Sequence, residues 1–343
     1  MGTSSVKGGM HIQLESRCLQ TGSEATGAIN VMLQETLPPC TLMLQFKGVE
    51  KTHWVERYSD APDADRSHWH LKSESAHFNG HQIIINVRYP IYHWNCNVPP
   101  GSYTFPFSLR LPHQLPGSFT FSKGSTHASI EYHFKSKFIL PNRKKLKDKV
   151  EVHIYEKIEA FSTNIVLEET IPLEGCCTNK GTFYFKSKFS QDAYTPDQVA
   201  SAIIEADNTY GNLKITHLAC TLWRTVRLRV VTSTWFTKEK ILEVRTRGVG
   251  IGEKLSESDA VFLNLDLPSV RHLIGSKFST TGSIIECMYS LDSHAILEGC
   301  SLCGGENPSI EIPMIIYAMY AHPPRQIEIP QGWNPQVFEQ VRF

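Results

Sequence analysis

The segment from residue 99 to residue 118 constrains the fold most, because it combines a strict two-residue alternation with proline and glycine at both ends. Its apolar residues occupy every second position, at Phe105, Phe107, Leu109 and Leu111. Side chains on a β-strand alternate between its two faces, so this spacing predicts a strand with one buried face. Pro106 has no N–H to donate to a neighbouring strand, which places the predicted strand at a sheet edge or a bulge.

Short alternating segments of the same kind run through the rest of the chain, and the first half shows no useful run with the 3.6-residue period of a helix. The segments that we predict as strands include 10–15, 42–46, 83–87, 135–140, 150–154, 284–291 and 310–316. A chain of 343 residues is long for one β-sandwich and suits two, since each takes about 100 to 180 residues. We therefore expect an all-β protein of two tandem immunoglobulin-like β-sandwich domains.

The charge composition narrows the classes of partner. The 34 basic and 34 acidic residues cancel, so bulk charge favours neither nucleic acid nor a membrane surface. No apolar run approaches the roughly 18 residues of a membrane span, and the polar start of the chain lacks the apolar core of a secretory signal. We expect a cytoplasmic protein without a transmembrane segment or a nucleic-acid partner; peripheral contact with a membrane stays open.

The densest positive run of the chain lies between residues 141 and 149. Its basic residues are Arg143, Lys144, Lys145, Lys147 and Lys149. One interpretation is a solvated hairpin turn between two predicted strands. The other is an anion site, because several Lys and Arg donors can bind the phosphates of a phosphorylated receptor tail or of an inositol-phosphate head group.

Nine cysteines are scattered along the chain, and buried free thiols are the expectation in a cytoplasmic protein of this size. The alternative is a zinc site, since closely spaced cysteines can both reach one tetrahedral ion. Its ligands would be Cys176, Cys177, Cys300 and Cys303. The histidines at positions 68, 70, 77 and 81 lack a carboxylate or cysteine that completes a ligand set, so we expect surface histidines and no cofactor.

The sequence contains none of the motifs that mark the common hydrolytic or phosphate-binding sites. It has no Gly-x-Ser-x-Gly, no glycine-rich phosphate loop before a helix and no His-Glu-x-x-His. We therefore expect that the protein is not an enzyme.

The tail, residues 323–343, is too apolar for a fully solvated end of a chain. Its apolar residues include Ile327, Ile329, Trp333, Phe338 and Phe343. Four prolines in the same stretch favour an extended conformation. We expect the tail either to pack back on the body of the protein or to add to the sheet edge of a partner.

The segment 99–118 also resembles the signature of the arrestin-like N-terminal domain, above all that of the α-arrestins. It contains Gly-x-Tyr-x-Phe-Pro-Phe followed by Leu-Pro-x-x-Leu-Pro-x-Ser-Phe. Residues 27–31, 44–50 and 128–135 resemble neighbouring strands of that domain, and residues 175–183 and 194–209 resemble hallmarks of the α-arrestin C-terminal domain. The resemblance implies an N-terminal sandwich over residues 1–158, a C-terminal sandwich over 159–322 and a separate tail.

The same resemblance implies a non-enzymatic adaptor or scaffold that binds cytoplasmic segments of membrane proteins in protein transport and endocytosis. Many α-arrestins recruit ubiquitin ligases through Pro-Pro-x-Tyr motifs, and this sequence contains none. A second hypothesis therefore stays open, in which the chain is a structural arrestin-fold subunit fixed in a large, stable multiprotein assembly.

Overall fold

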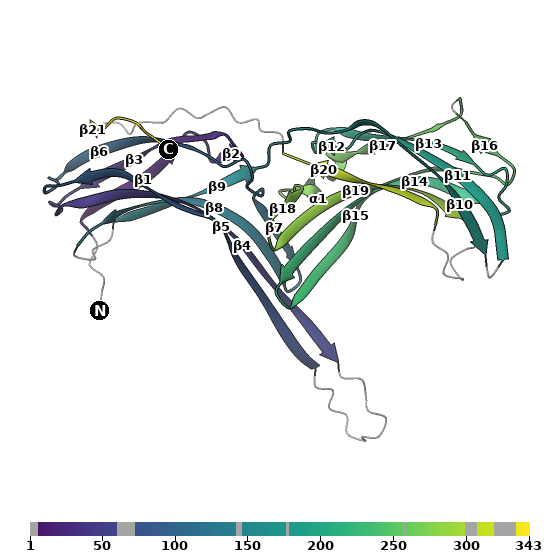
Figure 1. Ribbon diagram of the computed structural model, residues 1–343, viewed down its shortest axis with the longest axis horizontal. Coiled ribbons are helices and arrows are strands. Elements are labelled where there is room, and N and C mark those ends of the chain that lie inside the picture. The colour runs from purple at the N-terminus through teal and green to yellow at the C-terminus, as the bar shows by residue number, and fades with distance from the viewer. Residues whose placement is uncertain are drawn as a thin grey trace, which may run out of the picture.

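The computed structural model describes residues 6–59, 73–141, 146–175, 178–256, 258–298, 307–318 and 334–343. Within these ranges the chain is built from strands, apart from the 3₁₀ turn η1 (Leu267–Val270) and the helical turn α1 (Arg271–Ile274). The described strands form four sheets, which stack in two pairs that lie side by side (Figure 1). The prediction of an all-β protein with two sandwiches is confirmed.

The first sandwich holds the N-terminal strands together with the end of the chain. One of its sheets contains β1 (Gly8–Leu14), β3 (Glu24–Leu33), β6 (Gly101–Arg110), β21 (Gln336–Val337) and β22 (Val341–Arg342). The other sheet contains β2 (Cys18–Gln20), β9 (Lys147–Tyr155), β8 (Thr126–Ile139), β4 (Cys40–Ser59), β5 (Ser73–Trp94) and β7 (Phe119–Lys123). In these sheets the order is β1-β3-β6-β21 and β2-β9-β8-β4-β5, with β22 on β6 and β7 on β8.

The second sandwich is built in the same way from the strands that follow. One sheet contains β10 (Thr163–Gly175), β11 (Thr178–Gln191), β13 (Val199–Asp207), β16 (Lys254–Leu255) and β17 (Val261–Asp266). The other contains β12 (Ala193–Tyr194), β20 (Ser309–Ile316), β19 (Ile285–Leu297), β14 (Ile215–Val230), β15 (Ser233–Val249) and β18 (Thr280–Thr281). The predicted strands at 284–291 and 310–316 are therefore present as β19 and β20.

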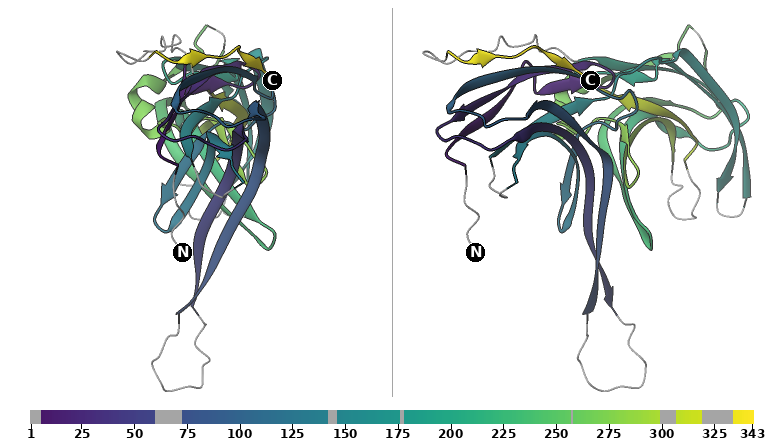
Figure 2. Two further views of the ribbon diagram at one scale, coloured as in Figure 1. Left: turned by 90° about the vertical axis from the view of Figure 1, so that its left-hand side faces the viewer. Right: turned by 60° about the vertical axis from the view of Figure 1, so that its left-hand side comes forward.

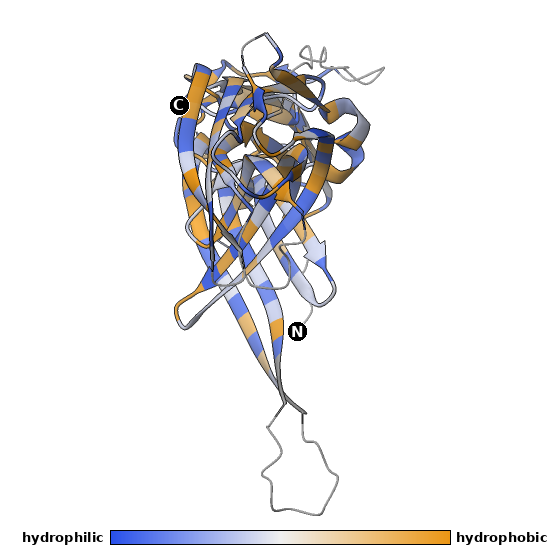
Figure 3. Ribbon diagram, turned by 90° about the vertical axis from the view of Figure 1, so that its right-hand side faces the viewer, coloured by the Kyte–Doolittle hydropathy of each residue, from blue (hydrophilic) through white to orange (hydrophobic). Residues whose placement is uncertain are grey.

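Two-residue alternation decides which side chains form the core. In β8 the buried residues Ile130, Tyr132 and Phe134 alternate with residues that point outward. In β6 the side chains of Phe105 and Phe107 are at most 1% exposed. Each such burial contributes about 1.5 to 3 kcal/mol, so a one-residue slip of register would be costly. Figure 3 shows hydrophobic and hydrophilic residues alternating along many of the strands.

The β4–β5 hairpin is much longer than the sheet that it belongs to. β4 has 20 residues and β5 has 22, whereas β8 pairs with β4 only as far as the pair His53–His127. Beyond that pair the two strands continue together and project away from the body of the molecule (Figures 1 and 2). The root of the hairpin is packed, because Trp54 is fully buried and its ring stacks on Phe78 at 5.2 Å.

Candidate protein-binding surfaces

The predicted basic run continues into a larger positive surface of the first sandwich. Lys147 and Lys149 begin β9, where they pair with Lys137 and Lys135 of β8. Lys135 in turn lies opposite Gln45 of β4, whose partner on β5 is Arg88. Alternation along each strand directs these side chains to the outer face of one sheet. We define this surface, the basic face, by Lys47, Arg88, Lys135, Lys137, Lys147 and Lys149.

Two pKa shifts report the positive potential of the basic face. Burial and the charges of Lys149 and Lys47 lower the pKa of His133 to about 4. Burial, followed by Lys147 and Lys137, lowers the pKa of Lys135. Glu151 opposes this potential, since it pairs with Lys149 at 3.2 Å. The lysine charges add to the effect of burial in both shifts, and this concentration of positive charge attracts an approaching anion.

The structure covers only part of the predicted anion site. β8 and β9 form an antiparallel pair, as the hairpin interpretation predicts. Lys147 and Lys149 lie on its second strand, and Arg143, Lys144 and Lys145 lie outside the described residues. The sequence did not predict the contributions of Lys47 and Arg88, because cross-strand neighbours that far apart in the chain are set by sheet register.

The C-terminal tail lies along the side of β6 that does not pair with β3. β21 pairs in parallel with Tyr103 and Thr104, and β22 pairs in parallel with Phe107 and Ser108. The Phe338 N–H donates to the Thr104 carbonyl and the Phe343 N–H to the Ser108 carbonyl, both at 3.0 Å. Pro106 lies between these two contacts on the same edge and has no N–H. Its missing donor explains why the tail forms two short strands instead of one.

The aromatic side chains of the tail close the side of the first sandwich. The ring of Phe338 lies 4.5 Å from Phe105 and 4.6 Å from Tyr92, and the ring of Phe343 lies 4.4 Å from Tyr89. Phe105 belongs to β6, whereas both tyrosines belong to β5, so the two rings fill the seam between the edges of the two sheets. Ile327, Ile329 and Trp333 of the predicted tail contact lie outside the described residues. Packing on the body is thus the arrangement of the tail residues that the structure describes.

A buried carboxylate joins the two sandwiches. Glu50 of β4 is 1% exposed and accepts N–H groups from Ser283, Ile284 and Ile285 at 2.8, 2.7 and 3.1 Å. Those amides belong to the first residue of β19 in the second sandwich and to the two residues before it. We call this contact the Glu50 joint. Hydrogen bonds to a charged group are stronger than neutral ones, so the joint fixes how the long hairpin meets the second sandwich.

The four predicted zinc ligands all lie outside the described part of the chain. These ligands are Cys176, Cys177, Cys300 and Cys303. The histidines His68 and His70 also lie outside the described residues. His77 and His81 lie on β5 and are exposed, as predicted for surface histidines. Among the described residues, no group of three or more His, Cys, Asp or Glu side chains is arranged to hold a metal ion.

The expectation of buried free thiols holds for some cysteines only. Cys40, Cys220 and Cys287 are buried and free, whereas Cys96 is exposed and Cys18 is half-buried. Burial raises the pKa of the Cys287 thiol to about 12, so this side chain stays protonated at neutral pH.

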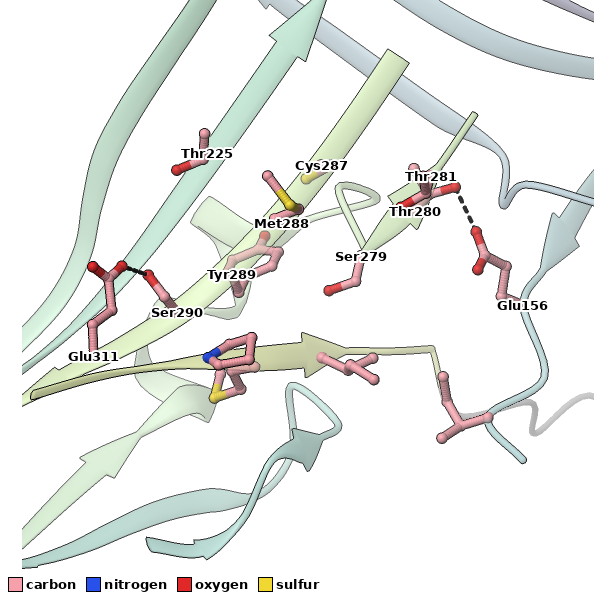
Figure 4. A pocket seen from close by; sticks show the side chains of 14 residues that line it. Glu156, Thr225, Ser279, Thr280, Thr281, Cys287, Met288, Tyr289, Ser290 and Glu311 are labelled. Atoms are coloured by element: carbon pink, nitrogen blue, oxygen red, sulfur yellow. Dashed lines mark hydrogen bonds between the residues drawn. The ribbon is translucent and has the colours of Figure 1, made fainter. Parts of the chain in front are cut away.

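A cavity of about 600 Å³ opens where the chain passes from the first sandwich to the second (Figure 4). Its walls come from β18, β19, β20 and the segment after β9. The sequence did not indicate it, because no motif links residues from such distant segments. In the ranges that the structure describes, no helix has the length and apolar character needed to cross a bilayer.

Comparison with known proteins finds a family match over the first sandwich. Residues 10–160 match the family model described as "Arrestin (or S-antigen), N-terminal domain". The first sandwich is an arrestin-like N-terminal domain. "Arrestin domain-containing protein A" of Dictyostelium discoideum is 23% identical over 172 residues, which make up 49% of this chain and 29% of that relative. The chain therefore spans less than a third of the length of the curated relative.

Proposed function

We propose that this chain is a non-enzymatic adaptor that binds acidic or phosphorylated segments of other proteins on its basic face. The observation that carries the proposal is the row of cations across four adjacent strands. Burial is the largest cause of the lowered pKa values of His133 and Lys135, and the charges of this row lower them further. The match of residues 10–160 to the arrestin N-terminal domain supports a protein-binding role. The partners that we propose are cytoplasmic segments of membrane proteins that undergo transport and endocytosis. We place the chain in the cytoplasm or at the membrane periphery.

The chemistry of the basic face fits an extended acidic segment. Lys135 and Lys149 lie opposite each other, and so do Lys137 and Lys147, so the pairs present donors on neighbouring strands. Opposite residues on neighbouring strands lie about 4.5 to 5.5 Å apart, a spacing at which one phosphate or carboxylate receives donors from both. Such contacts are exposed, so the binding should weaken as salt screens the charges.

We also propose the division of the chain that supports this role. Residues 1–158 form the partner-binding sandwich, residues 159–322 form the second sandwich, and residues 323–343 form the tail.

A charge-reversal experiment tests the proposal. A labelled, doubly phosphorylated acidic peptide is titrated with the wild-type protein and with the double variant Lys135→Glu/Lys149→Glu. We expect affinity for the variant to be at least tenfold lower. Lys7→Glu is the matched control, because Lys7 is exposed and lies outside the basic face. Equal affinity of all three proteins would refute the role of the basic face.

The projecting β4–β5 hairpin favours one alternative, a structural subunit of a stable assembly. Strands that leave the body of a protein present backbone edges and side chains to neighbouring chains. Native size in a gentle cell extract separates the two functions. A transient adaptor runs near the 38.8 kDa of the free chain, whereas a fixed subunit runs in a much larger particle of constant composition.

A further inference from the structure

The cavity of about 600 Å³ has the size of a small-molecule site and lies beside the junction of the two sandwiches. Sites for small ligands occupy roughly 300 to 1,000 Å³ and occur preferentially between domains. Its apolar lining includes Ile158, Met288, Met314 and Ile315. This inference goes beyond the proposed adaptor function, because it concerns a different surface and a different kind of ligand.

The polar groups of the cavity lie toward two ends. At one end Glu156 accepts the Thr280 hydroxyl at 2.5 Å and the Gly117 N–H at 2.8 Å. At the other end Glu311 lies beside Ser290 (Figure 4). The apolar walls run between these two carboxyl groups. A ligand that fills the space therefore meets an acidic group at each end.

The two carboxyl groups differ in their partners. Glu311 is already paired with the Lys238 ammonium group at 3.1 Å. Each hydrogen bond that the structure gives to Glu156 comes from a neutral donor, and burial raises the pKa of this carboxyl above its ordinary value. Among the described residues that line the cavity, none is a lysine, arginine or histidine. In the described part of the chain, Glu156 therefore has hydrogen-bond donors but no ion pair, so a cationic group in the cavity would supply a charged partner.

We propose that this cavity binds a small amphiphilic amine, whose ammonium group pairs with Glu156 while its alkyl body lies against Met288, Met314 and Ile315. The charge complementarity selects the head group, since a carboxylate head would bring like charges together and a neutral head would leave Glu156 without a counter-ion. The apolar walls select the body, because burying alkyl groups removes them from water.

Three probes that share the same alkyl chain but differ in head group separate the contribution of the head group from that of the alkyl body. Full-length protein is titrated by calorimetry with n-octylamine, n-octanol and octanoate at neutral pH. We expect saturable binding of the amine at one site, at least tenfold tighter than that of the alcohol, and the weakest binding for octanoate. Absence of saturable amine binding, or equal affinity for amine and alcohol, would overturn the proposal.

Three variants locate the binding. Glu156→Gln keeps an acceptor for Thr280 and Gly117 and is expected to abolish the preference for the amine. Glu311→Gln is the control and should change amine affinity less than twofold, because Glu311 already has Lys238 as its partner. Met288 lies half-exposed on the wall of the cavity, so the larger side chain of Met288→Trp fills part of the cavity and should weaken binding of all three probes. A preference for the amine that persists in Glu156→Gln would place the binding elsewhere; a single cooperative thermal unfolding transition in each variant confirms that it is folded.

Discussion

Replacing Glu50 should loosen the contact between the two sandwiches more than any surface substitution. Its carboxylate is 1% exposed and accepts three backbone N–H groups, from the first residue of β19 and the two residues before it. Glu50→Ala removes the carboxylate and leaves the three backbone N–H groups without their acceptor. A hydrogen bond to a charged group contributes about 1.5 to 3 kcal/mol, but the three bonds share one carboxylate and water can enter the gap. We expect a loss of about 3 to 5 kcal/mol in the free energy of unfolding.

The stability of Glu50→Gln should lie between that of Glu50→Ala and that of the wild type, because the amide oxygen of glutamine still accepts N–H groups but carries no charge. Urea unfolding followed by circular dichroism measures the loss of stability. Two sandwiches need not unfold in one step, so small-angle X-ray scattering of the native variants measures their separation independently. We expect a larger radius of gyration for Glu50→Ala than for the wild type.

Glu131→Gln is the matched control for this prediction. Glu131 lies on β8 of the same sheet, but it is half-exposed and pairs with Lys51 at 2.7 Å. An exposed ion pair contributes about 0 to 1 kcal/mol, so this variant should resemble the wild type. The reasoning would be refuted if Glu50→Ala unfolded at the same urea concentration as Glu131→Gln and scattered like the wild type.

Three further predictions concern the tail, the cavity and the basic face. Phe338→Ala/Phe343→Ala should destabilise the tail contact by about 2 kcal/mol and speed hydrogen exchange at the Arg110 amide, which donates to the Phe343 carbonyl; unchanged exchange would contradict the seam contact. Burial raises the pKa of Glu156 above 4.5, so its contribution to stability is present below pH 4.5 and is lost as pH rises through the raised pKa. Glu156→Gln should therefore gain stability relative to the wild type between pH 4.5 and pH 7 in urea titrations. A difference in unfolding free energy between the two proteins that does not change with pH would contradict this prediction. The affinity of the wild type for the phosphopeptide, measured by fluorescence anisotropy, should fall steeply between 50 mM and 500 mM salt. An affinity that does not change with salt would exclude binding of the peptide on the basic face.

Local patterns were sufficient to predict several of the strands. The alternation in residues 105–111 and in 284–291 matches β6 and β19, because burial of one face is encoded in neighbouring residues. Pro106 predicted that one side of β6 would lack a regular partner strand, because its missing N–H is a local property; among the described strands, only the short tail strands β21 and β22 lie on that side. The effect of Pro106 on the tail could not be predicted, since the tail reaches β6 from more than 200 positions further along the chain.

The surfaces depended on contacts that sequence spacing does not encode. Lys147 and Lys149 were predicted as cations of a hairpin, but the basic face also needs Lys47 and Arg88, which register brings beside them. Glu50 had no distinguishing motif, because an acidic residue in a strand is usually exposed. Glu156 became a candidate only when Thr280 and Gly117 were placed beside it.

Photo-cross-linking tests the central claim most directly. A doubly phosphorylated acidic peptide that carries a photoreactive group is bound to the full chain, irradiated and mapped by mass spectrometry. Our account predicts cross-links on the outward residues of β8 and β9, within residues 133–137 and 147–151, that disappear in Lys135→Glu/Lys149→Glu. Cross-links confined to the second sandwich, or the same yield in the variant, would contradict it.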